Sequence, residues 1–460
     1  MKILFLLLTS FSFPLILCKY YSYELETGKR NLQKNSTKRK TTTLCMIEEE
    51  QKYTVLNLDN HYNYYYYGRI YIGDKRQEFK INFDTGSRLL FVPSYNCKGC
   101  PNNSNKYIPY YSKYFKNLYQ KDSIKYIDGA KVQGEYYSDM ISLKPRGRFN
   151  LIAMDVIFLS VFEAQNLIND ENDGLMGLGI DNKGDSSKSF IETLYYQNQI
   201  QSPAFSFYLL GTQNISRLYI GDIINNVYIS DLFKGHIHEC FVPEGEKNWF
   251  CQINKNIKLK KNKKNKTFIT NSKFLFDTGT SYTNIPEKDF NVLIKFLNRE
   301  HECSVDENDC LNCKLSQKEK FGVLIELNFD ENNKFEINLD NMKKYIEEKK
   351  YNCFLGIFSC SYEYIYHFQI KKISTEDCWT LGDSSLRNNL ISFNILERKI
   401  SFVQNISNII NDRKIENSKW VGNIFNKLYT YRLFRFFYNN FLMILLIILL
   451  IIFIILYNLF

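Results

Sequence analysis

Two short segments of the chain repeat one pattern, an apolar strand that runs into Asp-Thr-Gly and then a hydroxyl residue. They span residues 81–87 and 274–280, and they place Asp84 and Asp277 at equivalent positions. A single Asp-Thr-Gly is weak evidence, because turns favour Asp and Gly. Two copies with matching apolar lead-ins indicate two related halves of the molecule that each contribute one carboxyl group to a shared site.

Two carboxyl groups held face to face have a distinctive acid–base chemistry. Because two negative charges at close range repel, Asp84 and Asp277 would share one proton and titrate as a pair. The ionised member can act as a general base on a bound water, while the protonated member donates to the oxygen of a scissile carbonyl. The pair therefore predicts hydrolysis of an amide bond, and we expect no covalent intermediate, no cofactor and no metal ion.

The residues that follow each aspartate fit a tight loop that approaches a second loop. The glycine lacks the Cβ that would block the opposing backbone. The threonine offers a hydroxyl to the opposing loop, and the next hydroxyl can hydrogen-bond the neighbouring carboxylate. We therefore assign active-site support to six residues: Thr85, Gly86, Ser87, Thr278, Gly279 and Thr280.

The elements that position these loops are predicted to be mainly strands. Short apolar or alternating blocks bounded by turn residues begin with a hairpin at 64–72 and 78–83. Further blocks lie at residues 138–143, 151–158, 205–210, 217–220, 273–276, 324–329 and 390–403. Helical patterns are few, and the clearest are at 190–197 and 287–298, the second directly after a proline. A length of 460 residues leaves room for two lobes.

Four segments, in order along the chain, resemble the motifs of the pepsin family of aspartic proteases. Residues 84–93 (Asp-Thr-Gly-Ser-Arg-Leu-Leu-Phe-Val-Pro) are similar to the first active-site motif, and residues 277–281 (Asp-Thr-Gly-Thr-Ser) to the second. Residues 173–179 and 379–383 resemble the segments that pass behind each aspartate. The resemblance, from about residue 64 to 403, implies an all-β, bilobal pepsin-like fold with the active-site cleft between two lobes.

The same family closes a β-hairpin flap over its substrate. By resemblance, Tyr126 should cover the substrate near the scissile bond, and Gly129 should permit the hairpin turn. Three positions depart from the family pattern. Phe91 stands where a Trp usually partners the flap Tyr, Ile127 where a small residue is normal, and Arg88 where Ser is common. These departures affect flap mobility and substrate preference, and they leave the catalytic pair intact.

These features predict an aspartic-type endopeptidase that hydrolyses peptide bonds through a water activated by the two-aspartate dyad. The alternative is a catalytically silent, membrane-tethered binding or adhesion protein on the same scaffold, and the intact Asp84 and Asp277 favour the enzyme. The Asn-, Lys- and Tyr-rich composition and the apolar tail resemble the membrane-anchored plasmepsins of malaria parasites. We expect a polypeptide substrate and a monomeric enzyme.

The net charge of +10 does not indicate a nucleic-acid partner. Lysines are spread along the chain or lie in polar runs such as residues 255–266, which favours a solvated insertion loop over a polyanion patch. The sequence has no RNP-type aromatic motif and no zinc-finger spacing. We therefore expect no binding of nucleic acid.

The two ends of the chain predict its location. Residues 3–17 form an apolar run after a basic start, which is typical of a secretory signal peptide; an uncleaved signal anchor is the alternative. Residues 441–457 are almost continuously apolar and predict a transmembrane helix, with a cleaved glycolipid-anchor signal as the alternative. We expect a single-pass type I membrane protein of the secretory pathway with a lumenal or extracellular catalytic domain.

The resulting domain plan has six parts. It comprises a signal peptide (1–18), a propeptide or flexible basic arm (19–52), an N-terminal β lobe (53–235), a C-terminal β lobe (236–404), a stalk (405–435) and a transmembrane helix (436–457). The basic arm could place a lysine between the two aspartates, as in a zymogen that awaits acidification.

Twelve cysteines fit an oxidising compartment. The pairs Cys97/Cys100 and Cys310/Cys313 have a spacing also seen in zinc sites, but neither has the further ligands that zinc requires, so we expect disulfides. Loss of Cys18 with the signal peptide would leave an odd number and at least one free thiol, unless Cys45 leaves with a propeptide. The sequence leaves the connectivity open.

Overall fold

The structure is a computed structural model that describes residues 53–404 with short gaps, and two strands nearer the N-terminus. The gaps are residues 64, 127–128, 146–149, 168–171, 181–187, 212–213, 225–235, 253–255, 352–360 and 375–377. The two strands, β1 (Asn31–Gln33) and β2 (Cys45–Ile47), pair antiparallel. The predicted signal peptide, stalk and transmembrane helix, and most of the predicted basic arm, lie outside the described residues. In the part of the chain that is described, no helix is long and apolar enough to span a membrane.

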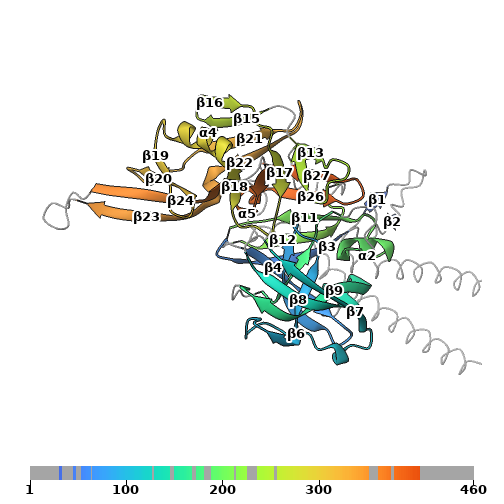
Figure 1. Cartoon of the computed structure of the whole chain (residues 1–460). Coiled ribbons are helices and arrows are strands. Elements are labelled where there is room, and N and C mark those ends of the chain that lie inside the picture. The colour runs from blue at the N-terminus through green and yellow to red at the C-terminus, as the bar shows by residue number, and fades with distance from the viewer. Residues whose placement is uncertain are drawn as a thin grey trace, which may run out of the picture. The chain divides into compact units, whose positions relative to one another are not determined.

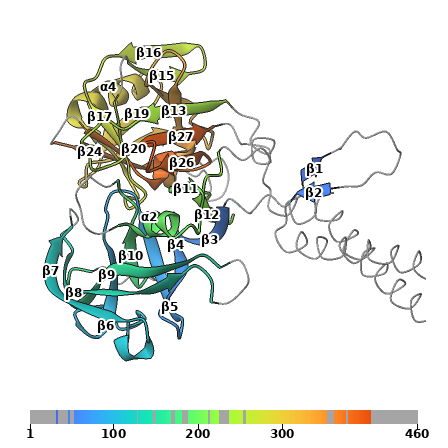
Figure 2. The same ribbon diagram turned by 90° about the vertical axis from the view of Figure 1, so that its right-hand side faces the viewer.

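The largest sheet has 13 strands and is built from segments near both ends of the described chain (Figures 1 and 2). In spatial order its strands are β13 (Ile237–Phe241), β27 (Lys399–Val403), β26 (Leu390–Asn394), β11 (Ala204–Tyr208), β12 (Ser216–Gly221), β3 (Tyr53–His61), β4 (Tyr65–Ile72), β5 (Gln77–Asp84), β10 (Gly174–Gly177), β6 (Leu90–Lys98), β9 (Ile152–Gln165), β8 (Lys131–Ser142) and β7 (Lys116–Lys125). Because β26 pairs antiparallel with β11, this sheet joins the predicted C-terminal lobe to the predicted N-terminal lobe.

Two smaller sheets complete the second half of the chain. One follows the order β14 (Phe250–Gln252), β17 (Lys273–Phe276), β25 (Cys378–Leu381), β18 (Thr283–Pro286), β24 (Ser361–Ile373), β20 (Cys310–Leu315) and β19 (Glu302–Val305), with β23 (Lys343–Tyr351) beside β24. The other follows the order β16 (Lys264–Phe268), β15 (Ile257–Lys261), β21 (Val323–Asn328) and β22 (Lys334–Asn338). The prediction of an all-β molecule with few helices is confirmed.

The helices begin where the sequence predicted them. The two longest are α2 (Phe190–Tyr196) and α4 (Glu287–Leu297). At the start of α2, Ser189 and Glu192 form a reciprocal capping box that satisfies two otherwise unpaired backbone N–H groups. The shorter elements are α5 (Asp383–Leu386) and the 3₁₀ turns Pro109–Tyr111 and Leu339–Met342.

The predicted first hairpin is present as β4 and β5. Gly73, at the turn between them, has φ +76°, a conformation that favours glycine because it has no Cβ. Strand β5 carries Phe79, Ile81 and Phe83 into the core, where each is almost fully buried. The strand therefore holds Asp84, its last residue, at the end of a rigid, packed element.

The two halves of the molecule repeat one arrangement of three strands. Strand β10 pairs parallel with β5 and antiparallel with β6. Strand β25 pairs parallel with β17 and antiparallel with β18. The two Asp-Thr-Gly segments therefore leave equivalent strands of equivalent units, as their sequence echo predicted.

Three disulfides are present among the described residues: Cys97–Cys100, Cys240–Cys251 and Cys303–Cys313. The expected disulfide between Cys97 and Cys100 is confirmed. The expected disulfide between Cys310 and Cys313 was wrong, because Cys313 bonds to Cys303. Strands β19 and β20 place Cys303 directly opposite Cys313, so that these two side chains meet across the sheet. Cys310 keeps a free thiol.

Candidate active site

The two predicted carboxyls lie at the ends of equivalent strands. Asp84 ends β5 and is buried, and Asp277 directly follows β17. Each carboxylate accepts a hydrogen bond from the glycine amide two residues later, at 2.7 Å from Gly86 and 2.8 Å from Gly279. Each loop therefore fixes the orientation of its own carboxyl group.

The two glycines bring the loops into close approach. A Cβ on Gly86 would lie 2.5 Å from Oδ1 of Asp277, and a Cβ on Gly279 would lie 2.2 Å from Oδ1 of Asp84. Real Cβ atoms essentially never make contacts under 3.0 Å. The reciprocal contacts mean that each aspartate faces the backbone of the other loop, as expected for two related loops on a pseudo-twofold axis.

The two threonines join the loops in a symmetric set of hydrogen bonds. The N–H of Thr85 donates to Oγ1 of Thr278, and the N–H of Thr278 donates to Oγ1 of Thr85. Each hydroxyl in turn donates to a backbone carbonyl before the opposite aspartate, that of Phe276 or Phe83, both at 2.7 Å. Both threonines are buried, so these bonds are shielded from water.

The two hydroxyl residues that follow the glycines differ from one another. The side chain of Thr280 hydrogen-bonds Asp277. The buried Oγ of Ser87 has no hydrogen-bond partner among the described residues. The expected bond from Ser87 to Asp84 is therefore absent here, and the two carboxyls have unequal surroundings despite the symmetry of the backbone.

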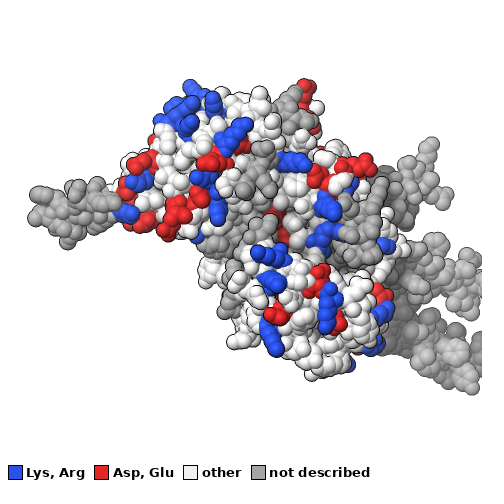
Figure 3. Space-filling model, in the orientation of Figure 1, with Lys and Arg blue, Asp and Glu red and all other residues white. Residues whose placement is uncertain are grey.

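The surroundings of the Asp277 carboxyl favour its protonated form. Burial, the charge of Asp84 and a hydrogen bond with the Asp84 side chain raise its pKa well above the usual range, against smaller opposing effects from Gly279 and Thr280. Figure 3 shows acidic atoms recessed between the elements around β4 and those around α5 and β18. The pair therefore combines a proton donor with a second carboxyl in direct contact.

The segments behind the aspartates are tied to the active-site loops by backbone hydrogen bonds. On the first side, the N–H of Leu178 donates to the carbonyl of Asp84, and that of Gly179 to Ser87. On the second side, the N–H of Asp277 donates to Leu381, and that of Asp383 to Thr280. Residues 173–179 and 379–383, which resemble the family's segments behind each aspartate, thus act as the floor of the site.

The predicted flap is a hairpin made by β7 and β8. At its end, the N–H of Tyr126 donates to the carbonyl of Ala130, and that of Gly129 donates to Tyr126. Gly129 has φ +91° with nothing near its missing Cβ, which fits an exposed turn. The ring of Tyr126 packs against Phe91 with 6.0 Å between the ring centres. Ile127, the remaining departure from the family pattern at the tip, lies outside the described residues.

Sequence reasoning gave no role to two residues behind the second loop, Asp383 and Arg387. Both are almost fully buried. A comparison of the two floor segments supplies a signal for Asp383, because Leu-Gly-Ile180 on the first side corresponds to Leu-Gly-Asp383 on the second. In the described part of the chain, no group of three or more His, Cys, Asp or Glu residues could hold a metal ion.

Comparisons with known proteins place the chain among the aspartyl proteases. The model of the eukaryotic aspartyl protease family matches residues 65–405. Rhizopuspepsin of Rhizopus chinensis is 26% identical over 368 residues, which cover 78% of this chain and 83% of the relative. Plasmepsin VI of Plasmodium berghei is 30% identical over 279 residues, 54% of this chain and 57% of the relative. Plasmepsin IV of Plasmodium falciparum is 34% identical over 185 residues, 38% of each chain.

Proposed function

The chain belongs to the eukaryotic aspartyl protease family, and on that premise we propose that it cleaves polypeptides as an endopeptidase in which Asp84 and Asp277 activate a water molecule. One observation carries this proposal: the reciprocal approach of Gly86 to the Asp277 carboxyl and of Gly279 to the Asp84 carboxyl. Because each glycine lies against the carboxyl of the opposite loop, the two carboxyl groups are close enough to act on one bound water molecule.

The unequal surroundings of the two carboxyls support separate roles for them. Asp84 serves as the general base that takes a proton from the water, while that water's oxygen bonds to the scissile carbonyl carbon. Asp277, whose proton is favoured by burial and by Asp84, donates it to the carbonyl oxygen. As the tetrahedral intermediate collapses, the C–N bond breaks, Asp84 passes the proton that it took from the water to the departing amine, and Asp277 takes its proton back from the former carbonyl oxygen. The hydrolysis needs no other reactant.

The hairpin at the rim supports a substrate-covering role for Tyr126 and Gly129. A peptide held in extended form under the flap would meet the Tyr126 ring, which Phe91 backs at 6.0 Å between ring centres. Closure of a hairpin over a substrate excludes water from the reacting atoms and strengthens the electrostatic interactions there. Tyr126 would thus act on binding and orientation, not on proton transfer.

The predicted location belongs to the same proposal. Residues 3–17 and 441–457 support a single-pass type I membrane protein whose catalytic part faces a lumen or the outside, with residues 19–52 as a basic propeptide or arm. Alkaline carbonate extraction of the full chain tests this arrangement. Retention in the membrane pellet supports a spanning helix, and release by a phosphatidylinositol-specific phospholipase would support the glycolipid anchor instead.

The activity is tested by exposing the full chain, in detergent micelles, to a diverse peptide library from about pH 3 to about pH 7. We expect cleavage inside the peptides that a statine-type transition-state inhibitor abolishes, and none from a matched Asp84→Ala variant. A folded wild-type chain that binds peptides but cleaves none at any pH, after removal of the N-terminal arm, would support the catalytically silent binding protein.

A further inference from the structure

The lysine-rich run in the second half of the chain forms a β-hairpin, where the sequence had predicted a solvated loop. Strands β15 and β16 pair antiparallel, with Lys261 directly opposite Lys264, and residues 262–263 make the turn between them. Every residue from 262 to 267 is exposed. The hairpin therefore holds its lysines at the surface on a backbone of fixed shape.

Strand β16 is an edge strand of its sheet. It has β15 on one side, and no described segment pairs with its other side. The free side of an edge strand presents N–H and C=O groups that can pair with another extended chain. Lysines on such an edge repel a second copy of the same edge, and they attract an extended segment of opposite charge.

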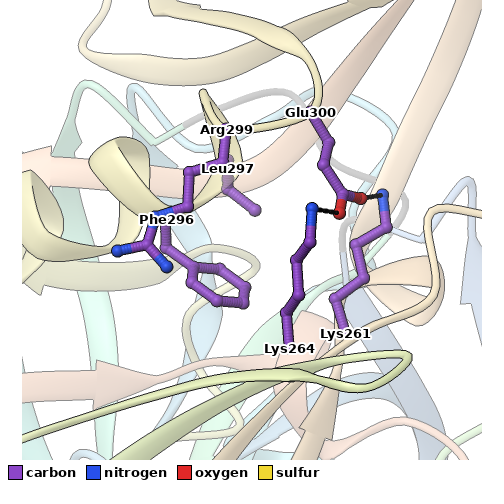
Figure 4. Close-up of a pocket in the computed structure, with 6 residues that line it drawn as sticks. All are labelled: Lys261, Lys264, Phe296, Leu297, Arg299 and Glu300. Atoms are coloured by element: carbon purple, nitrogen blue, oxygen red, sulfur yellow. Dashed lines mark ion pairs between the residues drawn. The ribbon is translucent and has the colours of Figure 1, made fainter.

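Four exposed cations gather along this strand, and we call them the basic edge: Lys263, Lys264, Lys266 and Arg299. The three lysines belong to the hairpin, and the arginine follows the end of α4. Arg299 lines a small hollow together with Lys264 and Lys261, so the helix end and the hairpin lie side by side (Figure 4). Figure 3 shows basic side chains gathered over β16 and the neighbouring α4.

Most of this positive charge is not neutralised within the described part of the chain. The carboxylate that ion-pairs with the basic edge is Glu300, which lies 2.7 Å from Lys264 and 3.0 Å from Lys261. The other three members of the basic edge have no described carboxylate within ion-pair distance. The guanidinium of Arg299 instead lies over the ring of Phe296, 5.7 Å from its centre. Three exposed cations thus remain available to an anionic partner.

Glu300 shows how this surface acts on a carboxylate. Hydrogen bonds from Lys264 and Lys261 lower the pKa of Glu300 to about 2, so that its carboxylate stays charged in acid. A free glutamate has a pKa of about 4.3 and loses its charge more readily. Carboxylates of a bound chain would meet further cations of the same kind along β16. The attraction would therefore persist under mildly acidic conditions.

We propose that the basic edge is an exosite that binds an acidic, extended segment of a polypeptide substrate. None of its four residues belongs to the loops that carry Asp84 and Asp277, so the bound segment lies outside the residues that are cleaved. The proposal rests on the proposed function, because it takes the partner to be a substrate. A polypeptide fits both features of the surface, since its carboxylates match the cations and its backbone can pair with a free strand edge. Binding there would raise the local concentration of the substrate at the enzyme.

The first experiment measures binding alone. A labelled peptide of alternating Glu and Ser is titrated with the full chain in detergent micelles at about pH 6, where glutamate is ionised, and its fluorescence anisotropy is recorded. We expect saturable binding that added salt weakens and that a matched Gln–Ser peptide lacks. The triple variant Lys263→Gln, Lys266→Gln, Arg299→Gln should bind about 10-fold more weakly, because three exposed ion pairs are lost together. An unchanged affinity would overturn the proposal.

Two further variants separate the basic edge from net charge. Lys75, Lys98 and Lys113 are also exposed and also have no ion pair among the described residues, and their triple replacement by Gln should leave the affinity unchanged. An equal loss in both triple variants would refute a specific site. Glu300→Gln should bind the peptide more tightly, because two lysines lose the carboxylate that they share. An affinity of this variant that does not rise would also count against the basic edge.

The second experiment measures cleavage. One cleavable peptide is joined through a flexible linker to the Glu–Ser segment or to the Gln–Ser segment. We expect the acidic segment to lower KM about 10-fold in the wild type with kcat unchanged, and to have no effect in the triple variant of the basic edge. Equal KM values in the wild type would refute the exosite while leaving the proposed function intact. If neither substrate were cleaved, the proposed function would fail, and the binding measurement would still decide whether the basic edge holds an acidic segment.

Discussion

Thr85 and Thr278 exchange hydrogen bonds across the boundary between the two lobes, at 3.1 Å and 2.9 Å. Thr85 directly follows Asp84, and Thr278 directly follows Asp277. The hydrogen bonds between the two threonines therefore fix the distance between the two loops that carry the catalytic carboxyls. Each threonine hydroxyl donates its proton to a backbone carbonyl of the opposite lobe, so both hydroxyls are engaged as donors. The relative position of Asp84 and Asp277 therefore depends on these two side chains.

Replacing one of these threonines by valine keeps the shape and removes the hydroxyl. Thr85→Val leaves the Thr278 N–H and the Phe276 carbonyl buried without a partner, which costs about 1–3 kcal/mol of stability. We expect the same range for Thr278→Val, with a fall in kcat larger than any rise in KM. Urea unfolding and steady-state kinetics measure both effects. Thr267→Val on the exposed strand β16 is the control, and equal behaviour of all three variants would rule out this role.

Gly86 and Gly279 are predicted to tolerate no side chain. Gly86→Ala and Gly279→Ala each place a methyl group within 2.5 Å of a carboxyl oxygen of the opposite aspartate, which must push the loops apart. Since misplacement by about 1 Å can reduce a rate on the order of 100-fold, we expect at least that loss in kcat/KM. Gly211→Ala, where nothing lies near the missing Cβ, should retain activity. An active Gly279→Ala enzyme would show that the loops do not approach as described.

The flap is predicted to act through the Tyr126 ring. Tyr126→Phe keeps the contact with Phe91 and should retain most of the activity. Tyr126→Ala removes the ring and should lower kcat/KM by about 10- to 100-fold, in the range expected for loss of an aromatic contact of ~1–3 kcal/mol. Steady-state kinetics on a single peptide distinguish the two variants. A large loss in Tyr126→Phe would transfer the role from the ring to the hydroxyl.

Much of the site could be predicted because its information is local. Asp-Thr-Gly after an apolar strand is contiguous in sequence, and α4 is marked by a preceding proline and by buried apolar residues at helical spacing. The partner of a side chain across the sheet is not local. Cys313 bonds to Cys303 because the register of β19 and β20 places them opposite one another. The spacing of the cysteines in the sequence does not determine that register.

The asymmetry of the site was also beyond the sequence pattern. Ser87 and Thr280 occupy equivalent positions, yet only Thr280 hydrogen-bonds its aspartate, because side-chain rotamers depend on packing around each loop. Asp383 lies in a segment that the resemblance had identified, but its burial and the electrostatic effect of Arg387 on it arise only when the chain folds.

Stability is predicted to fall at both ends of the pH range. Asp277 and Asp383 have pKa values raised well above the usual range, mainly by burial, so their neutral forms stabilise the native state below the unfolded pKa. That contribution is lost as the pH rises through the raised values. Urea unfolding from about pH 4 to about pH 8 should show this decline, and Asp277→Asn should reduce it. A decline of unchanged size in that variant would argue against a raised pKa at Asp277.

The acidic side of the profile involves a different carboxyl. Glu300 lies between Lys264 and Lys261, at 2.7 Å and 3.0 Å, and their hydrogen bonds lower its pKa to about 2 (Figure 4). A lowered pKa contributes stability above the unfolded value, and this is lost as the pH falls toward 2. In urea unfolding, Glu300→Gln should reduce the fall in the free energy of unfolding at acidic pH without changing the fall at alkaline pH. Because the site is near the surface, added salt should weaken the effect.

The most direct test of the central claim is single-turnover cleavage of one peptide by the full chain with Asp84→Asn or Asp277→Asn, each nearly identical in shape to the wild type. A two-carboxyl mechanism predicts that each substitution alone abolishes hydrolysis, while both variants remain folded by circular dichroism. Hydrolysis at the wild-type rate by either variant would contradict the claim that Asp84 and Asp277 act together on one water molecule.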